Sequence, residues 1–183
     1  MREFPSSLGL SGSLLIAHPN LLDPNFRRGV LIISASDPQE GSFGLVVNHP
    51  TEKSVGELLP DHELGALGEL PVFIGGPVAR DQLTFASFQW IDEALAIRTH
   101  LLLDEARELA AEGEGTVRAF LGYAGWSKGQ LEAELEQKAW LVQKPDQDLL
   151  SIEKCLALWP TIMREQGPWF RLLAAAPDDP SLN

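Results

Sequence analysis

The most constraining feature of the sequence is a strand, a glycine-rich turn and a helix that follow one another within residues 116–140. The first residues of this segment are mainly β-branched or aromatic, as is typical of a half-buried strand. Gly122 and Gly125 predict the turn, because glycine permits positive φ and close backbone approach. Ser127 and Gln130 have the spacing of a capping box, with Ser127 as the helix N-cap. Ligands often bind at such strand–turn–helix junctions, so this segment is the leading candidate for a site.

The helix predicted after the turn has one apolar face. Leu131 and Leu135 are four residues apart and therefore lie on the same side of a helix. Three acidic residues, Glu132, Glu134 and Glu136, are expected to face solvent. They cannot all share one helix face, so we do not expect them to form an acid–base pair.

Short apolar runs bounded by glycine, proline and other turn residues predict the remaining strands. These runs are 14–17, 30–33, 43–47, 72–74, 83–89, 95–97 and 141–142. Asp37 and Pro38, followed by Gly41, predict a hairpin loop between the second and third runs. Apolar periodicity predicts a helix over 103–112 and another from Cys155 to Met163. The pattern indicates one mixed α/β domain.

Composition limits the compartment and the partners. The 183 residues include 14 Lys and Arg against 26 Asp and Glu, a net charge of −12. Because such a surface repels phosphate backbones and anionic lipids, we expect neither direct nucleic-acid binding nor membrane attachment. One cysteine fits a reducing compartment, and we find no secretory signal and no apolar run of membrane-spanning length. We therefore expect a cytoplasmic, soluble protein.

Residues 125–129 match the G-x-S-x-G pattern of a hydrolase nucleophile elbow. That chemistry requires a histidine after the serine, and none follows His100. The capping box already accounts for Ser127, so we predict no catalytic residue here.

A metal site is the other chemical alternative. His18, Asp23 and His49 lie near predicted strand ends and would converge only through folding. Their spacing matches no metal-binding motif, and structural histidines are common at such places. We predict no metal and no cofactor.

Several separate motifs resemble the signature of the AlgH/YqgE family of bacterial proteins. The central group is Leu121-Gly-Tyr-Ala-Gly-Trp126, Gly129-Gln-Leu-Glu132 and Ala139-Trp-Leu141. The earlier groups, in the family's order, are Leu14-Leu-Ile-Ala-His-Pro19, Asp23-Pro24, Phe26-Arg27, Gly44-Leu-Val-Val-Asn48 with Pro50, and Gly75-Gly-Pro-Val78. The resemblance covers about residues 9–145.

The resemblance implies an α+β fold in which strands form a small closed β-barrel with a bifurcated sheet, surrounded by helices. We expect a single domain over 1–183, with loose tails at 1–8 and 176–183. The family has no established activity, although some members carry a transcriptional-regulator label tied to alginate control. The chain departs from the family pattern at four positions. Many relatives have Cys and His at the places of Ser34 and Ser36 and Arg at that of His49, and often a small non-hydroxyl residue at that of Ser127.

The strand–turn–helix segment and the family motifs together predict a ligand or partner surface. Its residues are Asp23, Arg27, Asn48, Tyr123, Gly125, Trp126 and Gln130. Trp126 is expected at the tip of the turn, and Trp and Arg are frequent anchors of interfaces. We rank a binding or regulatory module, acting through protein or small-ligand contacts, as the first hypothesis. The second is an enzyme for a small polar or anionic substrate using Asp23, Arg27, Asn48 and the 123–130 turn, and the third is a transcriptional regulator.

Overall fold

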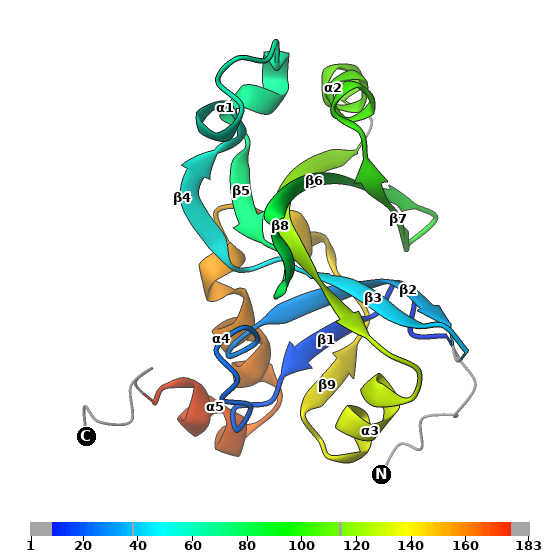
Figure 1. Ribbon diagram of the computed structural model, residues 1–183. Helices are drawn as coiled ribbons and strands as arrows, with labels where there is room; N and C mark the ends of the chain where they lie inside the picture. Colours follow the sequence, from blue (N-terminus) through cyan, green and yellow to red (C-terminus); the bar gives the residue numbers. More distant parts are fainter. Residues whose placement is uncertain (1–8, 38, 114, 177–183) are drawn as a thin grey trace.

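Strand β8 (Thr116–Trp126) runs through the middle of the molecule and is the strand at which the sheet branches (Figure 1). The computed structural model describes residues 9–37, 39–113 and 115–176. The other strands are β1 (Leu14–Ala17), β2 (Val30–Asp37), β3 (Gly41–Val46), β4 (Pro50–Ser54), β5 (Pro71–Ile74), β6 (Val78–Ile91), β7 (Ala94–Leu101) and β9 (Trp140–Gln143). The helices are α1 (Val55–Leu58), α2 (Leu103–Glu112), α3 (Gln130–Glu136), α4 (Cys155–Glu165) and α5 (Pro168–Ala174), with 3₁₀ turns η1 (Gly65–Glu69) and η2 (Gln147–Leu150).

The sheet is curled but open. Its strand order is β4-β5-β8-β3-β2-β1-β9, and the β6–β7 pair branches from β8. The first half of β8 pairs with β5 and β6, whereas its last residues pair with β3. Closure of a barrel requires the two edge strands to meet. In the described chain β4 and β9, at the two ends of the strand order, do not pair and lie apart, in the upper and lower halves of the view in Figure 1, so the predicted closed barrel is not found.

The mixed α+β class and most of the predicted elements are confirmed. The hairpin joins β2 to β3, and the Asp37 carboxylate accepts the N–H groups of Gln39 and Glu40 at 2.7 and 3.0 Å. Helix α2 has the predicted bounds and ends at Gly113, whose φ is 70°. Pro38 lies outside the described residues, as do the predicted tails apart from Ala176.

The predicted turn at Gly122 and Gly125 is wrong, because β8 continues through both residues to Trp126. Gly122 has φ of 70°, and an added Cβ would lie 2.6 Å from the Val78 carbonyl oxygen. A glycine is therefore needed for strand pairing at an irregularity, where the β6–β8 register shifts. The glycine that predicts a turn here instead lets β8 continue through an irregularity in its pairing with β6.

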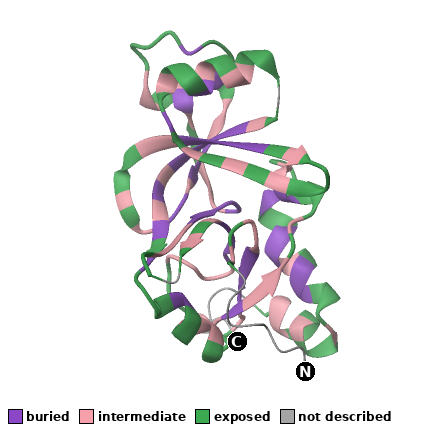
Figure 2. Cartoon of the chain, turned by 90° about the vertical axis from the view of Figure 1, so that its right-hand side faces the viewer, coloured by how far each residue is buried: buried purple, intermediate pink, exposed green. Residues whose placement is uncertain are grey.

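Three buried clusters meet on β8. Phe120 packs under α4 with strands β1 to β3, Ala119 packs beneath α2, and Trp126 packs beside α3. Buried residues gather along the central strands, while the outer sides of the helices are exposed (Figure 2). The Trp159 indole N–H of α4 donates to the Ala17 carbonyl at 2.8 Å, which ties the helix to the end of β1.

One charged side chain lies inside this core. Arg118 is 1% exposed, and its Nη1 donates to the Val47 carbonyl at 3.1 Å. Its guanidinium carbon lies 4.7 Å from the centre of the Phe73 ring. Its Nε and Nη2 have no hydrogen-bond partner among the described residues. Burial lowers the pKa of Arg118 to about 10, against an opposing effect of the Cys155 thiol.

Candidate functional site

The predicted site residues on β8 point to different parts of the molecule. Trp126 is only 5% exposed and belongs to the cluster beside α3. Tyr123 packs instead against the cluster under α4, with its ring 4.9 Å from that of Phe43. His100, which the sequence did not single out, lies 4.8 Å from the Phe43 ring. Trp126 is therefore a core residue, and its expected place at the tip of a turn is wrong.

Trp126 is held by the carboxylate of Glu134, which the sequence pattern predicts to face solvent. The Glu134 Oε2 accepts the indole N–H of Trp126 at 3.0 Å and that of Trp140 at 2.8 Å. The Gln130 amide donates to Glu134 Oε1 at 3.1 Å. The Phe26 ring stacks on Trp126 with centroids 6.2 Å apart. The tryptophans and acidic residue of the signature thus join β8, α3 and β9 to one another.

The helix start also differs from the prediction. Helix α3 begins at Gln130, after Gly129 with φ of 76°, and Ser127 is not its N-cap. Half of the capping box is present, because the Ser127 N–H donates to Gln130 Oε1 at 3.1 Å. The Ser127 hydroxyl also donates to that oxygen, at 3.2 Å, on the exposed surface. Gly125, next to Trp126, is exposed.

The predicted residues outside β8 have structural hydrogen bonds. Asn48 is 5% exposed; its Oδ1 accepts the Val30 N–H at 2.7 Å and its Nδ2 donates to the Arg28 carbonyl at 2.9 Å. Asp23 accepts the Asn25 N–H at 2.8 Å, which closes a local turn. Arg27 is half-buried, and its backbone N–H donates to the Asp23 carbonyl at 2.8 Å. The side chains of Asp23 and Asn48 therefore organise the segment 23–30.

His49 supports the same segment. Burial lowers its pKa, and a hydrogen bond with the Arg27 backbone opposes that shift. Within the described residues, no group of three or more His, Cys, Asp or Glu side chains is placed to hold a metal ion. His18, Asp23 and His49, the three candidates from the sequence, do not form such a group.

A groove that the sequence did not reveal lies between the end of β1, the α3–β9 turn and helix α5. It consists of two adjoining cavities that share His18 and Lys138. The larger, about 480 Å³, is lined by Leu10, His18, Leu135, Lys138, Trp140, Leu141, Val142, Gln166 and Phe170. The smaller, about 350 Å³, is lined by His18, Asn20, Leu21, Gln137, Lys138 and Ala139. None of the seven predicted site residues lines either cavity.

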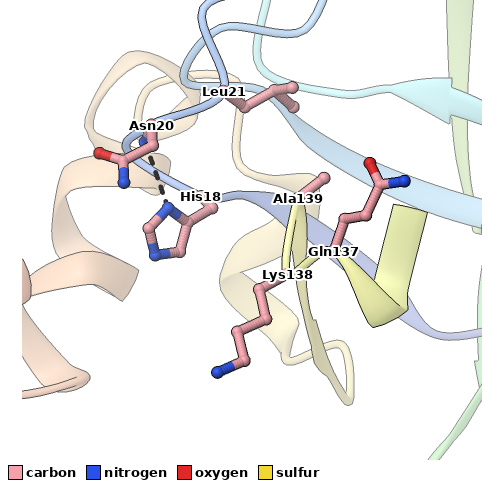
Figure 3. Close-up of a pocket in the computed structure, with 6 residues that line it drawn as sticks. All are labelled: His18, Asn20, Leu21, Gln137, Lys138 and Ala139. Carbon is pink, nitrogen blue, oxygen red and sulfur yellow. Dashed lines mark hydrogen bonds between the residues drawn. The ribbon is translucent and has the colours of Figure 1, made fainter. Parts of the chain in front are cut away.

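Local backbone contacts fix the two shared residues. The His18 N–H donates to the Ala139 carbonyl at 2.9 Å, which joins the end of β1 to the α3–β9 turn. Lys138 has φ of 58° in that turn, and its N–H donates to the Leu135 carbonyl at 3.0 Å. The His18 and Lys138 side chains project to the same side, whereas Gln137 points away from them (Figure 3).

The His18 ring has a defined hydrogen-bonding direction. The Asn20 N–H donates to its Nδ1 at 3.2 Å, so the neutral ring carries its proton on Nε2. Partial burial, and then the charge of Lys138, lower the pKa of His18 below its usual value. Phe170 packs edge-on against the ring, with centroids 5.6 Å apart. His18 is therefore a neutral donor beside a cation and an aromatic wall.

The branched, open α+β sheet places the protein in a structural class with solved members. A protein from Corynebacterium diphtheriae has the same fold, with a TM-score of 0.73 at 20% identity over 96% of this chain and 95% of that one. The solution structure of AlgH from Pseudomonas aeruginosa matches with a TM-score of 0.64 and 29% identity, covering 97% of this chain and 98% of that one.

The sequence comparisons define the family. The AlgH-like family model matches residues 14–171, so the chain belongs to the AlgH-like family. A UPF0301 protein of Thermobifida fusca is 36% identical over an alignment of 198 positions that covers 100% of both chains. Another, of Streptomyces coelicolor, is 38% identical over 188 positions and 95% of each chain. The family resemblance predicted from the sequence motifs is confirmed.

Proposed function

We propose that the protein is a binding module that holds a small, elongated and largely apolar ligand in the groove beside His18 and Lys138. The observation that carries the proposal is the meeting of a largely apolar cavity and a second cavity of mixed polarity at these two residues. Their volumes lie in the range of small-molecule sites, which are typically apolar with a few placed polar groups. A cytoplasmic location, expected from the single cysteine, is part of the same proposal.

The walls of the groove support binding of an apolar chain. Leu141 and Val142 are half-buried neighbours on the edge strand β9, and both line the larger cavity. Leu141 packs toward the cluster under α4 and Val142 toward the cluster beside α3, as alternation along a strand requires. Phe170 is half-buried on α5, a helix in which no residue is fully buried. A ligand that covers these side chains removes apolar surface from water, which favours binding.

Helix α5 offers a matched pair of variants to test the proposal. Phe170 lines the groove, whereas its neighbour Trp169 is 64% exposed and lines neither cavity. We expect decanol, a neutral apolar probe, to shift the amide NMR signals of Leu141, Val142 and Phe170 in a saturable manner. Phe170→Ala should weaken this binding, and Trp169→Ala should leave it unchanged.

Shifts spread over the surface, or equal effects of the two variants, would contradict the proposed groove. As a check on folding, both variants should keep the dispersed spectrum of the wild type, because neither removes a fully buried side chain.

A further inference from the structure

We infer that the ligand of this groove carries a carboxylate, bound between Lys138 and His18, at one end of its apolar chain. This inference rests on the proposed function and specifies the chemical class of the ligand. It starts from the charges of the groove. Among the described residues that line the two cavities, Lys138 is the one with a charged side chain at neutral pH, and no acidic side chain is present. The net charge of −12 repels anions in general, so Lys138 supplies the local positive charge that an anionic ligand needs, and no lining carboxylate opposes it.

His18 supplies a second donor for the same anion. Because its Nδ1 already accepts the Asn20 N–H, its Nε2–H is the atom left to donate. Its side chain and that of Lys138 project to the same side of the α3–β9 turn (Figure 3). An ammonium group and a neutral N–H donor together match the two oxygens of a carboxylate, in which one negative charge is shared.

The rest of the groove fits the other end of such a ligand. Besides His18 and Lys138, the larger cavity is lined by Leu141, Val142 and Phe170, which are apolar. Gln166, at the end of α4, adds an uncharged polar group to this wall. With a single lysine and no arginine among its lining residues, the site neutralises one charge. A monoanionic head on an apolar chain, such as an alkanoic acid, meets these requirements.

Decanoate and decanol provide the test, because they share an apolar chain and differ in the charge of the head. Titrations at neutral pH, below the concentrations at which either probe forms micelles, should show decanoate binding about tenfold more tightly than decanol. Decyltrimethylammonium, which has the opposite charge, should bind more weakly than decanol.

Two lysine variants separate a specific contact from the general effect of charge. Lys138→Gln should reduce decanoate affinity by about tenfold and leave decanol affinity unchanged. Lys144→Gln makes the same change in net charge but lies outside both cavities, so it should leave both affinities unchanged. His18→Phe, which keeps an aromatic ring next to Phe170, should also reduce the preference for decanoate.

The possible contrary results are distinct. Equal binding of decanoate and decanol would overturn the carboxylate assignment and leave the binding groove in place. Binding of neither probe would overturn the proposed function itself. A preference for decanoate that Lys138→Gln and Lys144→Gln reduce equally would show that overall charge, and not this site, attracts the anion.

Discussion

Removal of the Trp126 side chain should destabilise the protein strongly, because this residue joins β8 to α3 and β9. Trp126 is only 5% exposed, its ring contacts those of Phe26 and Trp140, and its N–H donates to Glu134 at 3.0 Å. A Trp→Ala change at such a site costs about 3–5 kcal/mol of unfolding free energy. For a chain of this length, each kcal/mol lowers the melting temperature by about 2–4 °C, so Trp126→Ala should lower it by roughly 6–20 °C.

Smaller changes divide this effect into packing and hydrogen bonding. Trp126→Phe keeps much of the ring contact but removes the donor to a charged acceptor, so it should cost about 1.5–3 kcal/mol. Glu134→Leu removes the acceptor of both indole N–H groups, and each unsatisfied donor costs about 1–3 kcal/mol where it is buried. In a double-mutant cycle, Trp126→Phe and Glu134→Leu should be less than additive, because both remove the same hydrogen bond.

Thermal and urea unfolding, followed by circular dichroism, measure these differences. Trp169→Ala is the matched control, since the Trp169 side chain is 64% exposed and its loss should change stability by less than about 0.5 kcal/mol. If Trp126→Ala and Trp169→Ala unfolded at the same temperature, Trp126 would not be the core residue described here. Full additivity of the double mutant would refute the hydrogen bond between the indole and the carboxylate.

Three further predictions follow from the glycines, the histidines and the net charge. Gly122→Ala should cost several kcal/mol more than Gly113→Ala in urea unfolding, because both residues have φ of 70° but only the Cβ at 122 meets a carbonyl oxygen, at 2.6 Å; equal costs would contradict the close approach of β6. Burial lowers the pKa of both His18 and His49, so acidification below about 6.5 adds protons to the unfolded chain first and should lower the unfolding free energy. His49→Gln should reduce this pH dependence, and an unchanged slope would refute the contribution of His49. With a net charge of −12, the protein should show no saturable sub-micromolar binding to duplex DNA by fluorescence anisotropy near physiological salt, and such binding would support the regulator hypothesis.

The sequence predicts those elements whose signals are local. The apolar runs give most of the strands, and the spacing around Asp37 and Gly41 gives the β2–β3 hairpin. The turn prediction fails at Gly122. The sequence alone does not distinguish a glycine in a turn from a glycine in a strand where a Cβ would collide with a neighbouring carbonyl oxygen. Glu134 is misassigned for a related reason: helix periodicity places it away from the leucines, but the indole N–H groups that bind it come from other elements.

The groove could not be predicted from a single segment. His18, Lys138 and Phe170 are more than 30 positions apart along the chain, and each has an ordinary local context. Three contacts bring them together: the pairing of β1 with β9, the hydrogen bond from the His18 N–H to the Ala139 carbonyl, and the ring contact of His18 with Phe170. His18-Pro19, at the end of an apolar run, is the one local signal that points toward this place.

The buried Arg118 affects the register in which β3 pairs with β8. Its Nη1 reaches the Val47 carbonyl, 71 positions away along the chain, from the strand that also pairs with β3. If β3 slipped along β8 by one pair of residues, this carbonyl would move away and leave a guanidinium without an acceptor in the core. An uncompensated buried charge is far more costly than the loss of an apolar contact, so misaligned pairings become unfavourable. Arg118 therefore favours the native register of β3 on β8 over shifted registers.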